Sequence, residues 1–506
     1  MSVLSIIYLI AALLVALYGG NALFLSVLYL RRRRERPIQP PMPEDWPAIT
    51  IQLPIYNELY VVKRLVDAVA ALDYPRRCLQ VQVLDDSTDE TTSLARAHVA
   101  YHRARGLDIT LIHRRDRAGF KAGALAHGLE MARGEYVAIF DADFVPSPDF
   151  LKQTVPYLLA ERDLAFVQAR WGYLNVDYST LTAAQTLALD GHFVVEHLGR
   201  NRNGLLMNFN GTAGVWRRAA IDAAGGWQGD TLTEDVDLSL RSQLGGWRAL
   251  YLPEVEVRQE LPPQMAAFKR QQARWATGAA QCLFKLARPL LRGTQKASVP
   301  PPGKTRALLT WSSRLEALLH LSVWIAHPMS LVLLLLTLPV MLGQVPMAFN
   351  LTVFWLVALG PVVAYALSQR HLYPDWLRRM RYMPVLALIG TGLALSNTLA
   401  IGKGLLGRNL PFRRTPKFRI EGQTDRWLDN RYVLPFDWVV VGELALAVYA
   451  LAAVVVALMM GNFLAVPFLL LYVGGYGYIG LHGLRDGWAH SRLRARHRRV
   501  PVVVDS

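Results

Sequence analysis

Long apolar runs mark both ends of this chain and leave a more polar middle. The first run, Ser2 to Leu30, has only small or weakly polar interruptions, and four arginines, Arg31 to Arg34, follow it directly. As a helix it is long enough to cross the roughly 30 Å hydrocarbon core of a bilayer. A cleaved signal peptide would instead have a basic start and a small-residue cleavage site. Because basic residues beside a span favour the cytoplasmic side, we predict a transmembrane helix with its arginine end in the cytoplasm.

Further apolar runs fill the second half of the chain. Two basic stretches, Arg370 to Arg381 and Gly407 to Arg426, flank the run 383–402. A single crossing there would leave one basic stretch outside, against the positive-inside bias. Glycine and polar residues also interrupt this run, which favours a helix that lies in the interface or re-enters without crossing. We therefore predict an interfacial helix at 383–402 and four C-terminal spans, at 316–343, 350–368, 436–459 and 463–482.

The polar middle has the alternating pattern of an α/β domain. Short β-rich runs at 48–53, 79–84 and 136–140 are separated by helical patterns such as 60–72 and 90–105. Strands that alternate with helices predict a parallel sheet. In such sheets ligands bind at the carboxyl ends of the strands, and aspartates follow the second and third of these runs directly.

These patterns divide the chain into five parts. The predicted parts are an N-terminal helix with its basic anchor (1–36), a proline-rich linker (37–47), an α/β domain (48–290), a membrane region (291–485) that includes a cytoplasmic loop at 403–435, and a basic cytoplasmic tail (486–506).

Composition agrees with a membrane protein that carries one soluble domain. Of 506 residues 52% are hydrophobic and only 19% are charged, which excludes a disordered chain. The net charge of +16 is concentrated next to the apolar runs, so it indicates membrane anchoring rather than nucleic-acid binding. Two cysteines, Cys78 and Cys282, are too few for a disulfide framework or a zinc site. The domain is expected to face the reducing cytoplasm.

The pair Asp141 and Asp143 is the first candidate for chemistry. It follows a predicted buried strand, and two carboxylates at this spacing can bind one hard cation together with substrate phosphates. A turn or cap is the structural alternative. An NTPase is excluded because the nearest phosphate-loop string, at 302–305, lacks its first glycine.

Two later motifs add an acid cluster and an aromatic–cationic helix. Glu234 and Asp235 follow Thr233, and one of these carboxylates could take a proton from a hydroxyl, although a helix N-terminus also favours acids. Gln271, Arg274 and Trp275 offer hydrogen bonds, a phosphate clamp and a stacking face. An interfacial helix with an aromatic anchor is the alternative for this second motif.

Taken in order, these motifs resemble family 2 glycosyltransferases, in particular the membrane-embedded, cellulose-synthase-like enzymes. Asp85-Asp86 resembles the nucleotide-binding aspartates, and the other three motifs resemble the metal-binding Asp-x-Asp, the Thr-Glu-Asp and the Gln-x-x-Arg-Trp of that family. The string Phe209 to Trp216 is most similar to cellulose-synthase-like A and C proteins, which make mannan and glucan backbones. The resemblance covers roughly residues 47–290 and implies a GT-A-like fold.

The resemblance also implies a role for each candidate residue. A nucleotide sugar, UDP-glucose or GDP-mannose, would be held at its nucleotide by Asp85 or Asp86 and Glu58, with Lys121 against the diphosphate. Mg²⁺ or Mn²⁺ would be bound by Asp143 with Asp141. Asp235, beside Glu234, would be the base, while Gln271, Arg274 and Trp275 would hold the diphosphate and the acceptor.

Two activities and one inactive alternative remain open from the sequence. The enzyme would invert the anomeric centre and extend a β-glycan processively, or it would add one sugar to a lipid acceptor such as ceramide or diacylglycerol. A catalytically inactive assembly subunit would need to lack a metal-binding or base carboxylate, and all are present. The string Arg414 to Phe418 lies where cellulose synthases carry a gating loop, so gating is a further expectation.

Overall fold

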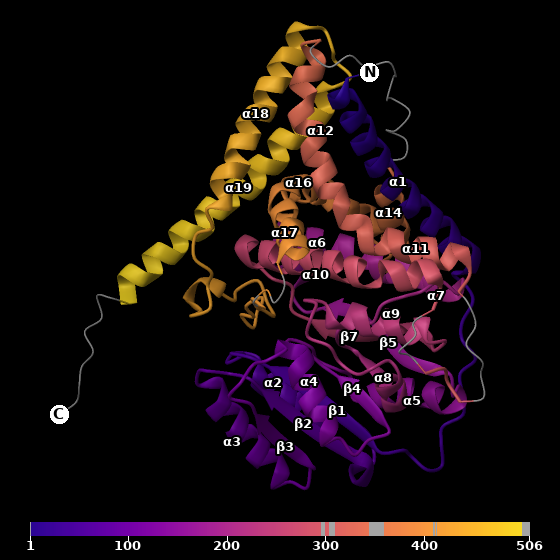
Figure 1. Ribbon diagram of the computed structural model, residues 1–506. Coiled ribbons are helices and arrows are strands. Elements are labelled where there is room, and N and C mark those ends of the chain that lie inside the picture. Colours follow the sequence, from indigo (N-terminus) through magenta and orange to yellow (C-terminus); the bar gives the residue numbers. More distant parts are fainter. Residues whose placement is uncertain are drawn as a thin grey trace, which may run out of the picture.

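A strand-rich domain and a group of long helices make up the two parts of the protein (Figure 1). The computed structural model describes residues 2–294, 299–302, 309–343, 359–407, 410 and 412–497. The sheet and its covering helices lie at the bottom of Figure 1, and the apolar helices extend upward from them. This division follows the predicted organisation into an α/β domain and a membrane region.

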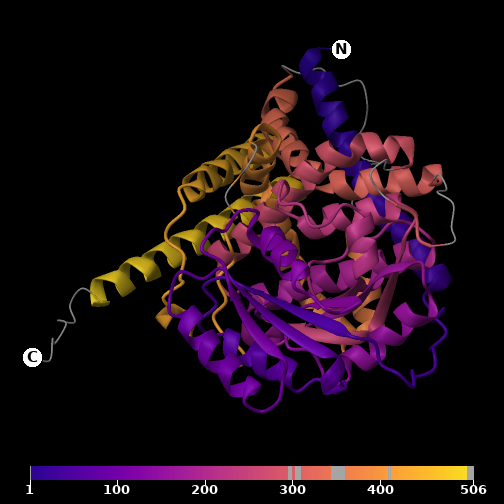
Figure 2. The same ribbon diagram turned by 60° about the horizontal axis from the view of Figure 1, so that its bottom comes forward.

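The domain is built on a seven-stranded sheet in the order β3-β2-β1-β4-β6-β5-β7. Turning the molecule brings its strands to the front (Figure 2). The strands are β1 Ile49–Ile55, β2 Leu79–Asp85, β3 Ile109–His113, β4 Tyr136–Ile139, β5 Leu164–Tyr173, β6 Gly214–Arg217 and β7 Arg248–Gln259. The three strands expected from the sequence are β1, β2 and β4, each within two residues of the predicted bounds.

The sheet is mixed, which corrects the prediction of a purely parallel one. Strands β1 to β4 are parallel, and β5 is parallel to β7. The short strand β6 is antiparallel to both β4 and β5. Loop 207–213, which precedes β6, lies at the carboxyl end of β4. Strand β6 therefore begins beside the last residue of β4 and runs in the opposite direction. This inversion brings loop 207–213 beside the aspartates that follow β4.

The sheet is buried on both faces, as parallel strands require. Ile49, Ile51 and Leu53 of β1 are fully buried, and the alternate positions Thr50 and Gln52 are buried as well. Both polar side chains form hydrogen bonds to the neighbouring strand: Thr50 Oγ1 donates to Gln80 Oε1 at 2.8 Å, and Gln52 Nε2 donates to Gln82 Oε1 at 3.1 Å. The helices that flank the sheet are α2 Val62–Ala70, α3 Thr91–Arg103, α4 Phe120–Glu130, α5 Phe150–Ala160, α8 Arg218–Ala223 and α9 Glu234–Leu244.

A layer of helices separates the sheet from the membrane region. The long helix α10 (Met265–Arg292) runs crosswise between the two parts (Figure 1). Around it lie α6 Thr180–Asp190, the π-helical segment η3 Gly191–His197, α7 Leu198–Arg202 and α11 Trp311–Ser322. The remaining 3₁₀ turns are η1 Arg76–Cys78, η2 Val176–Tyr178, η4 Val323–Ile325, η6 Met380–Tyr382 and η7 Trp427–Asp429.

Three helical stretches in the described ranges are long and apolar enough to cross a membrane. They are α1 Val3–Arg32, the stretch Trp311–Met341 that joins α11 to α12 (Ala326–Met341), and α18 Val439–Met459. They coincide with the predicted N-terminal span and with two of the four predicted C-terminal spans. The run 463–482 lies in α19 (Val466–His497) from Val466 onward, and this helix is not among these three.

The predicted interfacial helix is two helices rather than one. Helix α16 (Met383–Gly392) and helix α17 (Ala394–Leu406) meet at a bend; together with the preceding turn α15 (Trp376–Arg379), they form a pair bent by 44°. Such a bent pair is either a broken span or a re-entrant segment. The number of spans and the domain boundaries therefore stay predictions.

Part of the predicted membrane region lies outside the described residues. This applies to 350–358 of the second C-terminal run, to Arg408 in the basic stretch, to Gly303 to Thr305 in the phosphate-loop-like string, and to the tail beyond residue 497. The second half of the run 350–368 is described from residue 359 onward, and helix α14 (Gly360–Leu372) begins there.

Buried polar contacts join α10 to the apolar helices. Lys269 Nζ lies 2.6 Å from Glu443 Oε1 of α18, and both side chains are buried. On the α19 side, the backbone amide of Ala266 donates to Asp486 at 3.2 Å. Because α10 carries the predicted Gln-x-x-Arg-Trp motif, these contacts fix that motif relative to the membrane region.

Candidate functional site

One pocket opens at the carboxyl ends of β1 and β4, where the strand order predicts ligand binding. Its volume is about 960 Å³ with the open mouth included. The lining comes from the carboxyl ends of β1, β2 and β4, from helix α4 with Arg117 before it, from Trp171 of β5 and Gln259 of β7, from loop 207–213, from the start of α9, and from helix α10 with the segment 412–417. Of the predicted site residues, all but Asp85 line this pocket.

Asp141 and Asp143 stand at the end of β4, as the sequence predicts. The backbone amide of Asp141 donates to Thr212 Oγ1 at 2.9 Å, which ties this turn to loop 207–213. The side chain of Asp143 is only 2% exposed, whereas that of Asp141 is 35% exposed. The two carboxylates thus share one wall of the pocket, with one open to ligand and one covered.

Lys121 of α4 joins the two acidic clusters of the pocket. Its Nζ lies 2.6 Å from Asp141 Oδ1 and 3.8 Å from Glu234 Oε1, and it donates to the Gly211 carbonyl at 2.9 Å. Burial alone would lower the pKa of Lys121, but the neighbouring carboxylates outweigh it and raise that pKa. Lys121 is therefore a permanent cation at the centre of the site.

Glu234 and Asp235 begin α9 on the opposite wall. Asp235 Oδ1 accepts a hydrogen bond from the backbone amide of Val236 at 2.9 Å. Burial, followed by repulsion from Glu234, raises the pKa of Asp235 to about 7, with Lys121 acting in the opposite direction. A carboxylate with a pKa near neutrality is suited to accept a proton at physiological pH.

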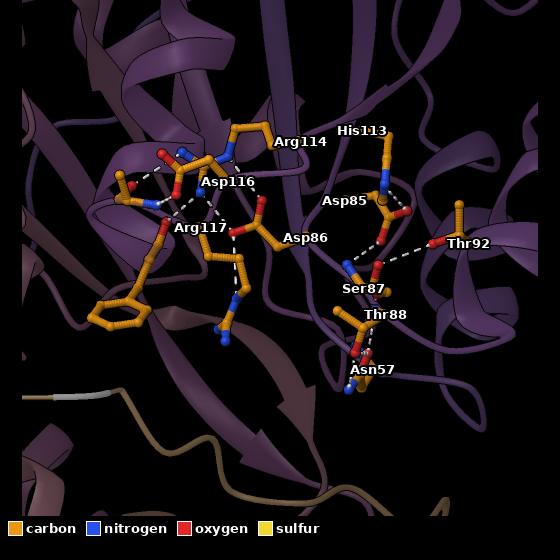
Figure 3. A network of polar contacts seen from close by, with 12 residues as sticks. Asn57, Asp85, Asp86, Ser87, Thr88, Thr92, His113, Arg114, Asp116 and Arg117 are labelled. Atoms are coloured by element: carbon orange, nitrogen blue, oxygen red, sulfur yellow. Dashed lines mark hydrogen bonds and ion pairs between the residues drawn. The ribbon is translucent and has the colours of Figure 1, made fainter.

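The two aspartates that follow β2 have different surroundings, as Figure 3 shows. Asp86 faces the pocket and forms a bidentate ion pair with Arg114, with distances of 2.8 and 2.7 Å. Asp85 is fully buried and accepts from the Ser87 amide at 2.9 Å, while its other oxygen lies 2.9 Å from His113 Nδ1. Of the two alternatives for nucleotide binding, the geometry therefore favours Asp86.

An aromatic–cation pair forms the wall of the pocket next to Asp86. The guanidinium carbon of Arg117 lies 3.3 Å from the centroid of the Tyr56 ring. Its Nε is 4.0 Å from Asp86 Oδ2 and has no hydrogen-bond partner among the described residues. A flat cation on an aromatic ring provides both a stacking surface and donors for a planar heterocycle.

Helix α10 brings its motif to the membrane side of the pocket. Gln271, Arg274 and Trp275 all line it. The guanidinium carbon of Arg274 is 5.2 Å from the Phe412 ring centroid, and its Nε has no partner among the described residues. The side chains of this motif are thus available to a ligand that enters between α10 and the sheet.

A strap formed by residues 412–421 crosses the pocket and supplies cations to it. Arg414 Nη1 lies 2.7 Å from Glu58 Oε2, and Lys417 Nζ lies 2.5 Å from Asp143 Oδ2. Burial raises the pKa of Glu58 to about 7, and Arg414 opposes this shift. The strap is held by Glu260, whose two carboxylate oxygens accept from the backbone amides of Phe418 and Arg419, each at 2.9 Å.

Loop 207–213 contacts both acidic walls of the pocket. Gly211 has φ +80°, and a Cβ built there would lie 2.9 Å from Asp235 Oδ2 and 3.3 Å from Lys121 Nζ. Glycine is required because its positive φ and lack of a side chain allow this close approach. The backbone amides of the loop are anchored by polar side chains behind it: Gln243 at Met207, Ser239 at Phe209 and Gln168 at Asn210.

This site lies within a recognisable sequence family. The profile described as "Glycosyltransferase like family 2" matches residues 47–278, a range that includes every predicted site residue from Glu58 to Trp275. Residues 47–278 are a family 2 glycosyltransferase domain. The matched range contains all seven strands of the sheet and, apart from the residues at 412–417, the lining of the pocket at its carboxyl edge.

Curated relatives of the glycosyltransferase domain come from plants. The chain is 42% identical over 280 residues to glucomannan 4-beta-mannosyltransferase 1 of Oryza sativa subsp. japonica, covering 53% of this chain and 54% of the relative. It is 40% identical over 286 residues to glucomannan 4-beta-mannosyltransferase 2 of Arabidopsis thaliana, covering 54% of each. The chain thus spans about half the length of the curated relatives that it matches.

A solved structure shares the fold. The mannosyltransferase PcManGT from Pyrobaculum calidifontis, in complex with GDP-Man and Mn²⁺, superposes with a TM-score of 0.51 at 23% identity. The match covers 79% of this chain and 99% of that one. This likeness confirms the GT-A-like fold expected for the glycosyltransferase domain.

Several pocket residues of the glycosyltransferase domain were not singled out by sequence reasoning. Asn210 belongs to the string Phe209 to Trp216 that supports the resemblance, but its side chain was given no role, and neither was that of Tyr56. Arg117 carries no motif, and only the tertiary fold brings it over Tyr56. Glu260 directly follows β7, and its contacts with the strap join residues 158 and 159 positions apart. The position of Glu260, an acid directly after a buried strand, is the one sequence feature that would have indicated it.

Proposed function

We propose that this protein is an inverting glycosyltransferase that uses GDP-mannose to build a β-linked mannan or glucomannan chain. One observation carries the proposal: Lys121 connects the Asp141 carboxylate to the Glu234–Asp235 pair in a single pocket. Donor-binding acids and a base are thereby within reach of the same sugar. The names of the plant relatives support mannosyl transfer into a glucomannan, and the structure with a similar fold was solved with GDP-Man.

A divalent metal fits the acidic wall of the pocket. No cluster of three or more metal-ligating side chains occurs in the described ranges, and in this proposal diphosphate oxygens and water supply the ligands beyond two carboxylates. Two carboxylates plus diphosphate oxygens are the usual environment of Mg²⁺, and hard oxygen ligands also suit Mn²⁺. Asp141 and Asp143 would hold the ion, which would stabilise the charge that develops on the leaving diphosphate.

The chain's own residues then account for binding and proton transfer. Lys121 neutralises charge on the diphosphate from the side of α4, and Arg274 does so from α10. Asp86 and the Tyr56–Arg117 pair receive the nucleotide base. Asp235 takes the proton from the acceptor hydroxyl as that oxygen attacks the anomeric carbon, and a single in-line attack converts an α-linked donor into a β-linkage. Trp275 offers its ring face to the acceptor sugar.

The surroundings of the pocket support synthesis at a membrane with the domain on the cytoplasmic side. Four arginines, Arg31 to Arg34, lie at the carboxyl end of α1 and directly after it, on the side where the chain continues to the domain. Helix α10 lies between the pocket and the apolar helices, and α17 packs directly on it: Thr277 Oγ1 donates to the Ala400 carbonyl at 3.0 Å. An acceptor bound at α10 is therefore next to the membrane region.

Product analysis tests this proposal. Membranes that contain the protein would be incubated with Mn²⁺ and labelled GDP-mannose or UDP-glucose, with membranes carrying Asp235→Asn as the control. We expect label from GDP-mannose in ethanol-insoluble material that a β-mannanase releases. Label in the organic phase would instead establish transfer to a lipid. If a β-glucanase released the label after incubation with UDP-glucose, the product would be a glucan rather than a mannan.

A further inference from the structure

A chain of four polar side chains runs from the pocket to helix α11. His320 Nε2 lies 3.0 Å from Asn208 Oδ1, Asn208 Nδ2 donates to Asn210 Oδ1 at 2.6 Å, and Asn210 Nδ2 lies 2.7 Å from His197 Nε2. Only Asn210 lines the pocket. We call this chain of contacts the amide relay. None of its four residues has a role in the reaction proposed above.

The orientation of Asn208 sets the direction of the hydrogen bonds in the amide relay, because its Nδ2 also donates to the Phe209 carbonyl at 3.4 Å, a group that can only accept. Asn208 uses its nitrogen toward Asn210, so its oxygen must accept from His320, whose Nε2 is then protonated. Asn210 receives this bond on its oxygen and must therefore donate from its nitrogen to His197 Nε2, which is unprotonated. If the Asn210 amide were flipped, its nitrogen would face the Asn208 nitrogen and its oxygen would face the lone pair of His197 Nε2. The amide relay therefore holds Asn210 in one orientation.

His197 is held as a neutral acceptor by its environment. Its side chain is completely buried, and burial lowers its pKa well below the usual range. The titratable and charged groups that face this region are His192 and Glu196 of η3, His320 of α11, and the buried pair Arg200–Glu316, whose Nη2 and Oε1 lie 2.8 Å apart. His197 is also the last residue of the π-helical segment η3, an irregularity that is frequent at functional sites.

Asn210 retains unused hydrogen-bonding capacity on its pocket side. A primary amide has two N–H donors and two oxygen lone pairs, and the amide relay uses one of each. The next residue, Gly211, is the one that approaches Asp235 Oδ2. A donor and an acceptor of fixed orientation beside the candidate base match a sugar hydroxyl, which needs both.

We propose that Asn210 binds a hydroxyl of the acceptor sugar, and that His197 and His320 are positioning residues that orient its amide through the relay. The inference rests on the proposed function, because it assumes a glycan acceptor beside Asp235. It adds a connection that the proposed function does not contain: α11, the first helix of the stretch toward the membrane, sets the geometry of the acceptor site.

The test measures acceptor binding separately from turnover. The purified full-length protein, with GDP and Mn²⁺, would be titrated with β-1,4-mannotetraose and with cellotetraose by calorimetry. The rates of transfer from GDP-mannose and of acceptor-free donor hydrolysis would be measured in parallel. The variants are Asn210→Ala, His197→Phe and His197→Gln, the last of which restores an acceptor atom. His327→Phe is the matched control, since its Nε2 lies 3.1 Å from Asn397 Nδ2, in the membrane region.

We expect Asn210→Ala and His197→Phe to weaken tetrasaccharide binding about tenfold, the loss of roughly one hydrogen bond. The KM for GDP-mannose and the hydrolysis rate should stay within about twofold. His197→Gln should recover most of the binding, and His327→Phe should bind as the unaltered protein does.

Three results would overturn the inference, and they are distinguishable. Unchanged binding by Asn210→Ala would show that Asn210 does not touch the acceptor. An equal fall in binding and hydrolysis for His197→Phe, with no recovery in His197→Gln, would reduce the amide relay to a structural contact. If the unaltered protein neither binds a tetrasaccharide nor transfers sugar to one, the proposed function fails, and the inference fails with it.

Discussion

Lys417 of the strap places its ammonium 2.5 Å from Asp143 Oδ2, so the chain itself neutralises one of the two proposed metal ligands. The parallel contact of Arg414 with Glu58 neutralises a second pocket carboxylate. Both contacts depend on a segment far away in the sequence, since Lys417 and Asp143 are 274 positions apart. Binding of a metal at Asp143 therefore competes with an internal cation.

Removing that cation should strengthen metal binding in the absence of donor. We expect Lys417→Ala to bind Mn²⁺ about five- to tenfold more tightly than the unaltered protein, because Asp143 no longer has to leave an ion pair that is largely shielded from water. Mn²⁺ electron paramagnetic resonance on the nucleotide-free protein measures this directly. Arg419→Ala is the matched control, because Arg419 is an exposed cation of the same strap that pairs with Glu421. Equal Mn²⁺ affinity in all three proteins would contradict the competition.

Replacing the candidate base should separate binding from chemistry. Asp235→Asn keeps the size of the side chain but cannot accept the proton, so we expect sugar transfer to fall at least 10³-fold while GDP binding changes less than about threefold. Asp230→Asn, an exposed acid paired with Lys285, serves as the control for loss of a carboxylate near the site. Near-normal turnover by Asp235→Asn would remove Asp235 from the mechanism.

The raised pKa of Asp235 makes transfer depend on pH. Since the base must be ionised and its pKa in the free protein is about 7, kcat/KM should rise about tenfold per pH unit below pH 7 and level off above it. The measurement is a pH profile of kcat/KM at saturating Mn²⁺. A flat profile between pH 5.5 and 8 would argue against this group.

The raised pKa of Asp235 makes the folded protein less stable as the pH rises, whereas the same rise in pH makes transfer faster. Because the folded-state pKa of Asp235 lies above the usual 3.8, the folded protein holds the proton longer than the unfolded chain does. The contribution of Asp235 to the free energy of unfolding therefore falls as pH rises from about 4 to 7. We expect Asp235→Asn to raise the unfolding temperature at pH 8 but not at pH 4, as thermal denaturation would show.

The buried pair Lys269–Glu443 should control the position of α10. Glu443→Ala breaks the buried pair and leaves the Lys269 ammonium with Asp437, 3.7 Å away and half exposed, and the loss of one partner of a buried pair typically costs about 3–5 kcal/mol. The double variant Lys269→Met with Glu443→Leu removes both charges and should recover most of the stability. Denaturant unfolding in detergent gives both values, and a double variant as unstable as the single one would show that the charge pair is not the cause.

The local framework was predictable because it rests on short-range signals. The strands β1, β2 and β4 are compact β-rich runs that end in proline or aspartate, and the acids after them lie where parallel strands place ligands. The antiparallel course of β6 was not predictable, because its four residues carry no periodic signal of direction. Only the path of loop 207–213 determines how that strand enters the sheet.

Residues whose role depends on tertiary contacts could not be predicted from the sequence. Asp85 and Asp86 are neighbours with the same side chain, yet His113 and Ser87 engage one behind the sheet while the other faces the pocket. Nothing in a dipeptide of aspartates distinguishes them. Likewise, the relation of the strap to Glu260 and Asp143 depends on the fold of the whole chain, whereas the family resemblance located the strap only approximately.

Loop 207–213 connects the two acidic walls of the pocket that we propose bind the donor and the acceptor. Thr212 sets its distance to the donor-binding wall, and Gly211 sets its distance to the base. Changes in this loop would shift both reactive partners at once, so it leaves little freedom for variation. The nucleotide end of the pocket, with Tyr56 and Arg117, lies outside this constraint. Exchange of one nucleotide sugar for another is therefore most accessible to evolution or redesign at that end, with the spacing between anomeric carbon and base left intact.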